Sequence, residues 1–257
     1  MIFISDIHHG LNGLNELPQK EGPIVILGDL INWIDYRDGS GIALDVFGVD
    51  NIKKLIEYRK NHDFKRRKVL WDKLFEVDAE KTIGKIEDAV QRQYEEVFSI
   101  LSKHEVWIIP GNVDSDSAMR SIAGNNVNFV DSTVVNYREY KIGFAGGGVP
   151  TPLRARGELS EDEFNTKLLK LEGVDIICTH APPLVDELVI DVITNKKEQG
   201  WSSLVDFIYK NKPLFSFFGD VHQPKAVRWR LGETDCINVG YNRATKKYHL
   251  FEDLVYG

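Results

Sequence analysis

Cysteine and long apolar runs are both scarce in this chain. Its 257 residues include two cysteines, Cys178 and Cys236, and each lies inside a short apolar run with no second cysteine nearby. That spacing excludes a disulfide framework and a zinc knuckle, so we expect two buried thiols. No apolar run approaches the roughly 20 residues of a membrane-spanning helix, which predicts that the protein has no membrane partner.

A signal-peptide core and an excess of positive charge are also missing. The N-terminus reaches the charged residue Asp6 after five residues, so we expect a cytoplasmic protein. The net charge of −7 disfavours nucleic acid as a general partner. The stretch from Lys53 to Lys73 is an exception, with nine basic and three acidic residues. This pattern is typical of a solvated helix face or of a cationic rim that attracts a small phosphorylated substrate.

Short runs rich in β-branched and aromatic residues predict strands that are buried on both faces. Three further candidate strands come close together near the C-terminus, at 226–230, 236–239 and 248–251, and predict an antiparallel portion. Together these runs indicate an α/β fold. The six predicted core strands are 1–5, 24–27, 106–109, 141–145, 174–178 and 214–218.

A long helical segment separates the second and third of these strands. Between Tyr36 and His104, apolar residues recur at three- and four-residue spacing, which predicts two or three helices. Connections between core strands usually span a few residues, so this segment has a purpose of its own. We expect one domain, 1–257, with a helical insertion at 36–104 that caps or borders the functional pocket.

Polar residues follow five predicted strands in succession. Ligands of open α/β sheets bind beyond the carboxyl ends of the strands, so we expect these side chains to meet. Imidazole and carboxylate together suit divalent transition metals, and two such ions can activate a bridging water for attack on a phosphoryl group. No G-x-S-x-G elbow or Cys-His signature competes with this chemistry. The five segments are Asp6-Ile7-His8, Gly28-Asp29, Gly111-Asn112-Val113-Asp114, Thr179-His180 and Gly219-Asp220-Val221-His222.

In this order the five segments resemble the successive motifs of the calcineurin-like metallophosphoesterases over nearly the whole chain. The resemblance implies a double β-sheet sandwich flanked by helices and a site for two divalent metal ions. We expect manganese first, with iron, zinc, nickel or magnesium as alternatives. One ion would be bound by Asp6, His8 and His222, and the other by Asn112 and His180, with Asp29 bridging. The predicted catalytic residues are Asp29, Asn112, His180 and Asp114.

Two positions depart from the family pattern. Val113 stands where relatives have a histidine that is thought to protonate the leaving group or contact the phosphate. Asp220 stands where relatives have a metal-binding histidine, so it is either a ligand of the second ion or a turn residue beside it. A carboxylate there adds negative charge, which weakens attraction for a dianionic phosphate. Both departures favour phosphodiesters, phosphoanhydrides or nucleotides over alkyl monoesters as substrates.

Two alternatives remain open at this point. A non-catalytic scaffold on the same fold would have no need to keep six potential metal ligands. A nuclease would use the basic insertion to hold a strand, with Tyr58, Phe64 and Trp71 as stacking aromatics, although burial of a helix face explains those aromatics equally well. His9 directly follows His8 and is either a substrate contact or a surface residue.

Overall fold

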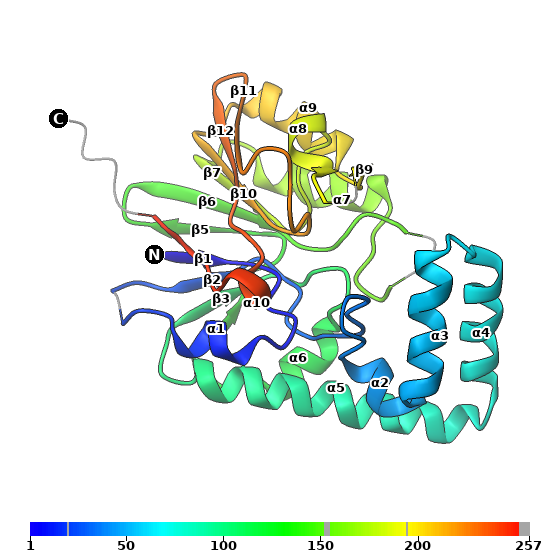
Figure 1. Ribbon diagram of the computed structural model, residues 1–257. Coiled ribbons are helices and arrows are strands. Elements are labelled where there is room, and N and C mark those ends of the chain that lie inside the picture. The colour runs from blue at the N-terminus through cyan, green and yellow to red at the C-terminus, as the bar shows by residue number, and fades with distance from the viewer. Residues whose placement is uncertain (20, 152–154, 194, 252–257) are drawn as a thin grey trace.

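The computed structural model describes residues 1–19, 21–151, 155–193 and 195–251. Two β-sheets pack face to face, and helices cover the outer face of each (Figure 1). This arrangement confirms the predicted α/β double-sheet sandwich flanked by helices. No helix within the described part of the chain is long and apolar enough to cross a membrane.

The first sheet has five strands in the order β13-β1-β2-β3-β4. Strands β1 to β4 run parallel, and only β13 pairs antiparallel, with β1. The residues of β1, β2 and β3 are buried throughout, as expected of strands covered on both faces. The five strands are β1 Ile2–Ile4, β2 Ile24–Ile26, β3 Val106–Ile108, β4 Val127–Phe129 and β13 His249–Leu250.

The second sheet has six strands in the order β11-β12-β10-β7-β6-β5. Its centre, β6, β7, β10 and β12, is parallel, and the two edge strands pair antiparallel with their neighbours. A separate hairpin joins β8 to β9. The strands are β5 Thr133–Tyr137, β6 Tyr140–Ala145, β7 Ile176–Thr179, β8 Ile190–Asp191, β9 Lys196–Lys197, β10 Phe215–Phe218, β11 Arg228–Leu231 and β12 Thr234–Asn238.

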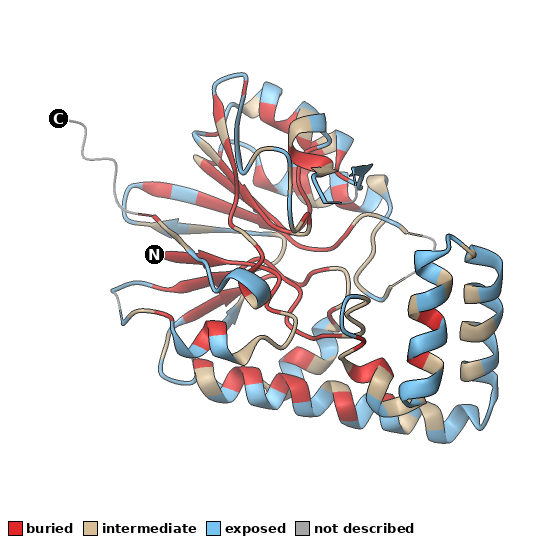
Figure 2. Cartoon of the chain, in the orientation of Figure 1, coloured by how far each residue is buried: buried red, intermediate tan, exposed pale blue. Residues whose placement is uncertain are grey.

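The buried side chains form three main layers (Figure 2). The middle layer lies between the sheets and includes Phe3 stacked on Phe217, with ring centroids 4.3 Å apart. The outer layers pack helices on the first and second sheets. The helices are α1 Leu11–Asn15, α2 Ile42–Phe47, α3 Val49–Lys60, α4 Phe64–Glu76, α5 Ala79–Leu101, α6 Asp116–Ile122, α7 Glu161–Leu168, α8 Asp186–Val189, α9 Ser202–Asn211 and α10 Asn242–Thr245, with a 3-10 turn at Leu169–Leu171.

All nine predicted strands are present with small shifts at their ends, but the C-terminal portion is not one antiparallel unit. Strands β11 and β12 form an antiparallel pair, whereas β12 also pairs parallel with β10, and β13 crosses to the other sheet. The sequence patterns did not predict β4, β5, α7 and α9. For α7 a signal exists, because Ser160 and Glu163 form a capping box at its start.

The segment from 36 to 104 contains four helices, α2 to α5. Helices α3 and α4 form a hairpin that projects from the body, and α5 runs back along the first sheet (Figure 1). Seven residues of α5 are buried, whereas α4 buries none. The insertion is therefore helical as predicted, but it has four helices where the sequence pattern indicated two or three, and only its last helix is extensively packed into the main core.

Candidate metal centre

The five sequence segments meet where the parallel strands of both sheets end. Asp6, His8 and Asp29 follow strands of the first sheet, and His180 and His222 follow strands of the second. The backbone of Asp6, His8, Asp29 and Asp220 is left-handed, with φ between 40° and 66°. Such conformations cost free energy in non-glycine residues and gather at functional sites.

Two glycines permit this close approach. A Cβ atom on Gly111 would lie 2.1 Å from Asp29 Oδ1, and one on Gly219 would lie 2.0 Å from Ser5 Oγ. Both distances are far inside van der Waals contact, so any side chain at these positions would push the loops apart. The glycines of the motifs are therefore required by the packing of the site itself.

The first cluster of potential ligands comprises Asp6, His8 and His222. His8 Nε2 lies 3.3 Å from His222 Nε2, and Asp6 Oδ1 lies 3.8 Å and 3.5 Å from these two nitrogens. Metal–ligand bonds of about 2.0–2.2 Å separate tetrahedral ligands by about 3.4 Å. The spacing of these three side chains thus suits a small divalent ion.

A second group of potential ligands comprises Asp6, Asp29 and His180, and Asp29 also lies beside the first cluster. Its Oδ2 atom is 3.6 Å from His8 Nε2, and its Oδ1 atom is 3.5 Å from His180 Nε2. Asp220 Oδ1 is 3.7 Å from the same His180 nitrogen. The two oxygens of Asp29 therefore face histidines of different clusters, which is the placement that a bridging carboxylate needs.

Three buried polar atoms at this place have no hydrogen-bond partner within the described residues: Asp6 Oδ1, Asn112 Oδ1 and His180 Nε2. An unsatisfied buried polar atom costs about 1–3 kcal/mol, so native proteins rarely leave several together. All three are lone-pair donors of the kind that bind metal ions. The residues present therefore fit divalent cations.

Burial and close charges shift the pKa values of the candidate ligands in both directions. Burial, followed by the charges of Asp114, Asp6 and Asp220, raises the pKa of Asp29 to about 8 against the opposing effect of His180. Burial and nearby His222 lower the pKa of His8 to about 4, so its imidazole is neutral, the form that binds metals. Asp6 differs from Asp29, because against the effect of burial the neighbouring His222 and His180 lower its pKa to about 2. Against its own burial, His180 has its pKa raised to about 9 by Asp29 and Asp220. Asp29 is therefore the carboxylate whose charge the protein leaves least compensated, and bound cations would supply the missing positive charge.

Asp114 lies next to these atoms but is directed toward backbone amides. Its carboxylate accepts backbone hydrogen bonds from Asp29, Leu30 and Gly111, at 2.7, 3.0 and 2.9 Å. Burial raises its pKa. The sequence motifs grouped Asp114 with the catalytic residues, and its contacts here are those of a residue that holds the loops.

Val113 and Asp220, the two departures from the family motifs, both donate backbone hydrogen bonds to candidate ligands. The Val113 side chain packs against the core beneath the first sheet, and its amide donates to Asp29 Oδ1 at 3.1 Å. The Asp220 amide donates to Asp6 Oδ2 at 2.9 Å, and its side chain is 24% exposed. Because the His222 side chain is also 34% exposed, the site is open to solvent on this side.

Several side chains that support the site carry no motif signal in the sequence. Tyr241 stacks its ring on His222, with centroids 3.8 Å apart and planes 1° from parallel. His9 Nε2 lies 2.8 Å from Glu96 Oε2 on α5, so His9 is held by the insertion. Neither partner could be found from spacing, because each comes from a distant part of the chain.

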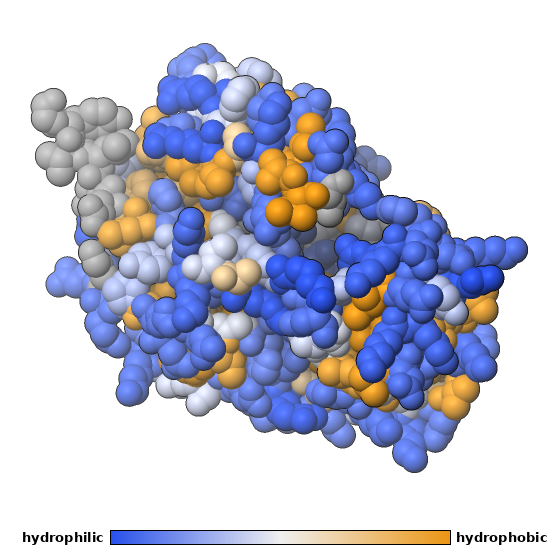
Figure 3. All heavy atoms as spheres, viewed as in Figure 1, coloured by the Kyte–Doolittle hydropathy of each residue, from blue (hydrophilic) through white to orange (hydrophobic). Residues whose placement is uncertain are grey.

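The basic stretch forms most of the α3–α4 hairpin, where exposed apolar and charged side chains are mixed (Figure 3). The guanidinium of Arg59 lies 4.2 Å from the centre of the Tyr36 ring. Partial desolvation and then Asp220 raise the pKa of Glu198, while Arg59 opposes them. Arg59 and Asp220 therefore act on the charge of Glu198 in opposite directions.

The aromatics of the hairpin do not form an exposed platform. Trp71 packs with Trp33, Phe47 and Phe75, at centroid distances between 5.7 and 6.3 Å. Another ring, Phe64, is exposed but lies beside the Arg67 guanidinium. Packing therefore explains Trp71, and support for nucleic-acid stacking is weak.

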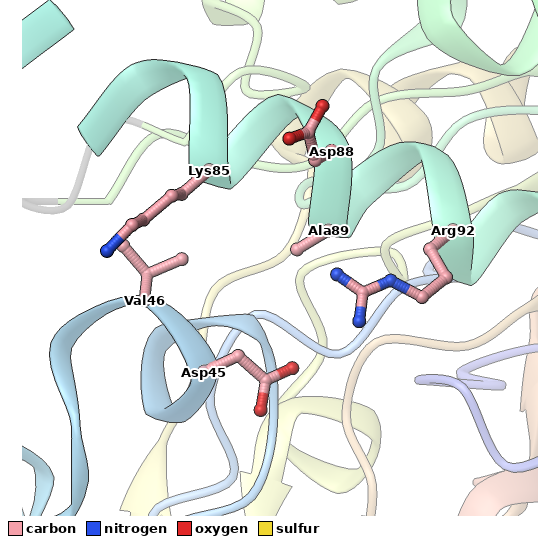
Figure 4. Close-up of a pocket in the computed structure, with 6 residues that line it drawn as sticks. All are labelled: Asp45, Val46, Lys85, Asp88, Ala89 and Arg92. Carbon is pink, nitrogen blue, oxygen red and sulfur yellow. The ribbon is translucent and has the colours of Figure 1, made fainter. Parts of the chain in front are cut away.

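A pocket of about 430 Å³ lies elsewhere, between α2 and α5 (Figure 4). It shares no residue with the clusters of potential metal ligands, and its charged groups alternate in sign, as is common where two helices meet at the surface. We therefore place the candidate site at the strand ends. The pocket is lined by Asp45, Val46, Lys85, Asp88, Ala89 and Arg92.

Comparisons with known proteins support the fold. One solved crystal structure matches with a TM-score of 0.60 and 16% identity over 93% of this chain and 89% of that chain. The protein TT1561 of Thermus thermophilus matches with a TM-score of 0.54 and 16% identity over 96% of both chains. A putative 5'-nucleotidase from Staphylococcus aureus in complex with alpha-ketoglutarate has a TM-score of 0.46 and 11% identity, over 96% of this chain and 48% of that chain, too low to support an assignment. No family model and no curated protein matches the sequence.

Proposed function

We propose that this protein is a metal-dependent phosphoesterase of the calcineurin-like type that hydrolyses phosphodiesters, phosphoanhydrides or nucleotides. The observation that carries the proposal is the set of unsatisfied buried atoms on Asp6, Asn112 and His180 around a carboxylate, Asp29, that faces two histidine clusters. A scaffold protein has no use for such atoms, and leaving them unpaired destabilises the fold.

Each residue has a role in this proposal. Asp6, His8 and His222 would bind one divalent ion, while Asn112, His180 and Asp220 would bind the other and Asp29 would bridge them. Manganese is the first candidate, since carboxylate, amide and imidazole ligands together suit it. When bound, two such ions lower the pKa of a water molecule and stabilise charge on a phosphoryl group.

The substrate preference follows from what the site lacks. Val113 offers no proton to a leaving group, and general acid catalysis contributes about 10²–10⁴-fold to rates. A leaving group that is stable as an anion departs with little protonation, so esters that carry one depend less on a proton donor. Asp220 adds negative charge beside His180, which disfavours dianionic monoesters relative to monoanionic diesters.

The test compares kcat/KM for bis-nitrophenyl phosphate, nitrophenyl phosphate and an alkyl monoester with manganese. We expect the diester to be preferred and alkyl monoesters to be poor substrates. Asp220→His should shift the preference toward monoesters, because it removes a negative charge. Purified protein that binds no divalent ion would favour the scaffold alternative, and a wild type that prefers alkyl monoesters would show that another residue donates the proton, with His9 the first to replace.

A further inference from the structure

The insertion reaches the candidate metal centre from the core side, through α5. Gln93 Oε1 accepts a hydrogen bond from the amide of Asn32 at 2.8 Å, and the hydroxyl of the next residue, Tyr94, lies 3.2 Å from Asp114 Oδ1. Gln93 and Tyr94 are both buried. A lid would contact the open side of a pocket, whereas these contacts are made to the inner side of the loops that carry the site.

Asp114 connects Tyr94 to the loop that carries Asp29. Its Oδ2 atom accepts hydrogen bonds from the amides of Asp29 and Gly111, and its Oδ1 atom accepts one from Leu30. Asp29 has φ 57°, a conformation that persists in a non-glycine residue only where its surroundings enforce it. The Asp114 carboxylate supplies part of that constraint.

Tyr94 adds a fourth hydrogen bond to this carboxylate. Its hydroxyl donates to Asp114 Oδ1 and accepts a hydrogen bond from the amide of Ser115 at 2.8 Å. The Tyr94 side chain is completely buried, so its hydroxyl bonds to protein groups and not to bulk solvent. Loss of the hydroxyl would leave the Asp114 carboxylate held by its three backbone hydrogen bonds alone, which would loosen its position beside the Asp29 amide.

We propose that Tyr94 is a positioning residue of the metal centre, which orients the bridging carboxylate Asp29 through Asp114. The helical insertion then completes the centre as well as bordering it. This inference rests on the proposed function for its metal ions, but it concerns a residue that no motif of the sequence contains.

The test is manganese titration of Tyr94→Phe by calorimetry, with kinetics on bis-nitrophenyl phosphate. Changes to residues that support metal ligands typically weaken metal binding or activity about 10–100-fold. We expect a loss of that size in manganese affinity and, at saturating metal, a lower kcat with KM for substrate nearly unchanged.

Two control variants separate positioning from general stability. Leu101→Ala removes buried packing from the same helix without touching a hydrogen bond of the site, so it should lower Tm yet keep manganese affinity. Tyr137→Phe removes a hydroxyl from β5, in the other sheet, and should leave manganese affinity unchanged. A Leu101→Ala variant that loses manganese affinity as much as Tyr94→Phe would overturn the inference.

A double-mutant cycle tests the route through Asp114. In an Asp114→Ala background, Tyr94→Phe should weaken manganese binding little further, because the pathway is already broken. Equal effects of Tyr94→Phe in both backgrounds would contradict the route, and unchanged affinity in the single variant would reject the role of Tyr94 whether or not Asp114→Ala folds. A wild type that binds two ions but cleaves no phosphoester would refute the proposed function alone, whereas one that binds no divalent ion would refute both.

Discussion

The two parts of the insertion differ in how they are held. Helix α5 buries seven residues, five of them in a core shared with the first sheet, and contacts the loops of the site. Helix α4 of the α3–α4 hairpin buries none and exposes Phe64 and Val69 by 57% and 60%. One connection between two strands thus contains a helix packed into the body and an exposed hairpin. We therefore expect substitutions in these two parts to have different effects on metal binding, stability and substrate binding.

The largest effect is expected at the centre that α5 supports. Asp29→Asn should abolish binding of at least one metal ion and lower activity by about 10²-fold or more, while the protein stays folded, because Asp29 lies at the ends of the strands and outside the apolar core. Metal content, kcat and circular dichroism together measure this. The matched control is Asp63→Asn at the start of α4, where asparagine is an equally good helix cap. Full activity with two bound ions in Asp29→Asn would disprove the bridging role.

The second-largest effect is expected on stability, where substitutions on α5 and on α4 should differ. Leu101→Ala on α5 should destabilise the protein by about 2–5 kcal/mol, since the side chain is fully buried. Val69→Ala on α4 should change the free energy of unfolding by less than about 0.5 kcal/mol, because that side chain is mostly exposed. Urea denaturation measures both. A similar loss of unfolding free energy in the two variants would mean that α4 is covered in solution, for example by a second copy of the chain.

The smallest effect is expected from the charges of the hairpin. Arg59→Ala should raise KM for a charged substrate about two- to five-fold at low salt with little change in kcat, as for other exposed charges at a rim. Neutralising Arg66, Arg67 and Lys68 together should have less effect, because they already contact Asp63, Phe64 and Asp72 on their own helix or at its cap. An unchanged KM in Arg59→Ala at low ionic strength would mean that the hairpin is a solvated face without a role in substrate binding.

Much of the fold could be predicted from local pattern. The buried strands β1, β2 and β3 are continuous apolar runs, and the insertion has helical periodicity, so both were predicted near their observed bounds. Strands β4 and β5 were missed because none of their residues is fully buried, so they lack the continuous apolar runs of the central strands. The assignment of the C-terminal strands to different sheets depends on long-range pairing, which no local signal encodes.

The sequence by itself determined which residue types follow each strand, and therefore that carboxylates and imidazoles meet at one edge of the fold. Only the tertiary structure decided how they are oriented. It turned the two oxygens of Asp29 toward different histidines, directed Asp114 to backbone amides, and brought Tyr94 beside it from a separate helix. The physical reason is that strand order and residue type are local properties of the chain, whereas side-chain orientation depends on close packing and hydrogen bonds between segments distant in sequence.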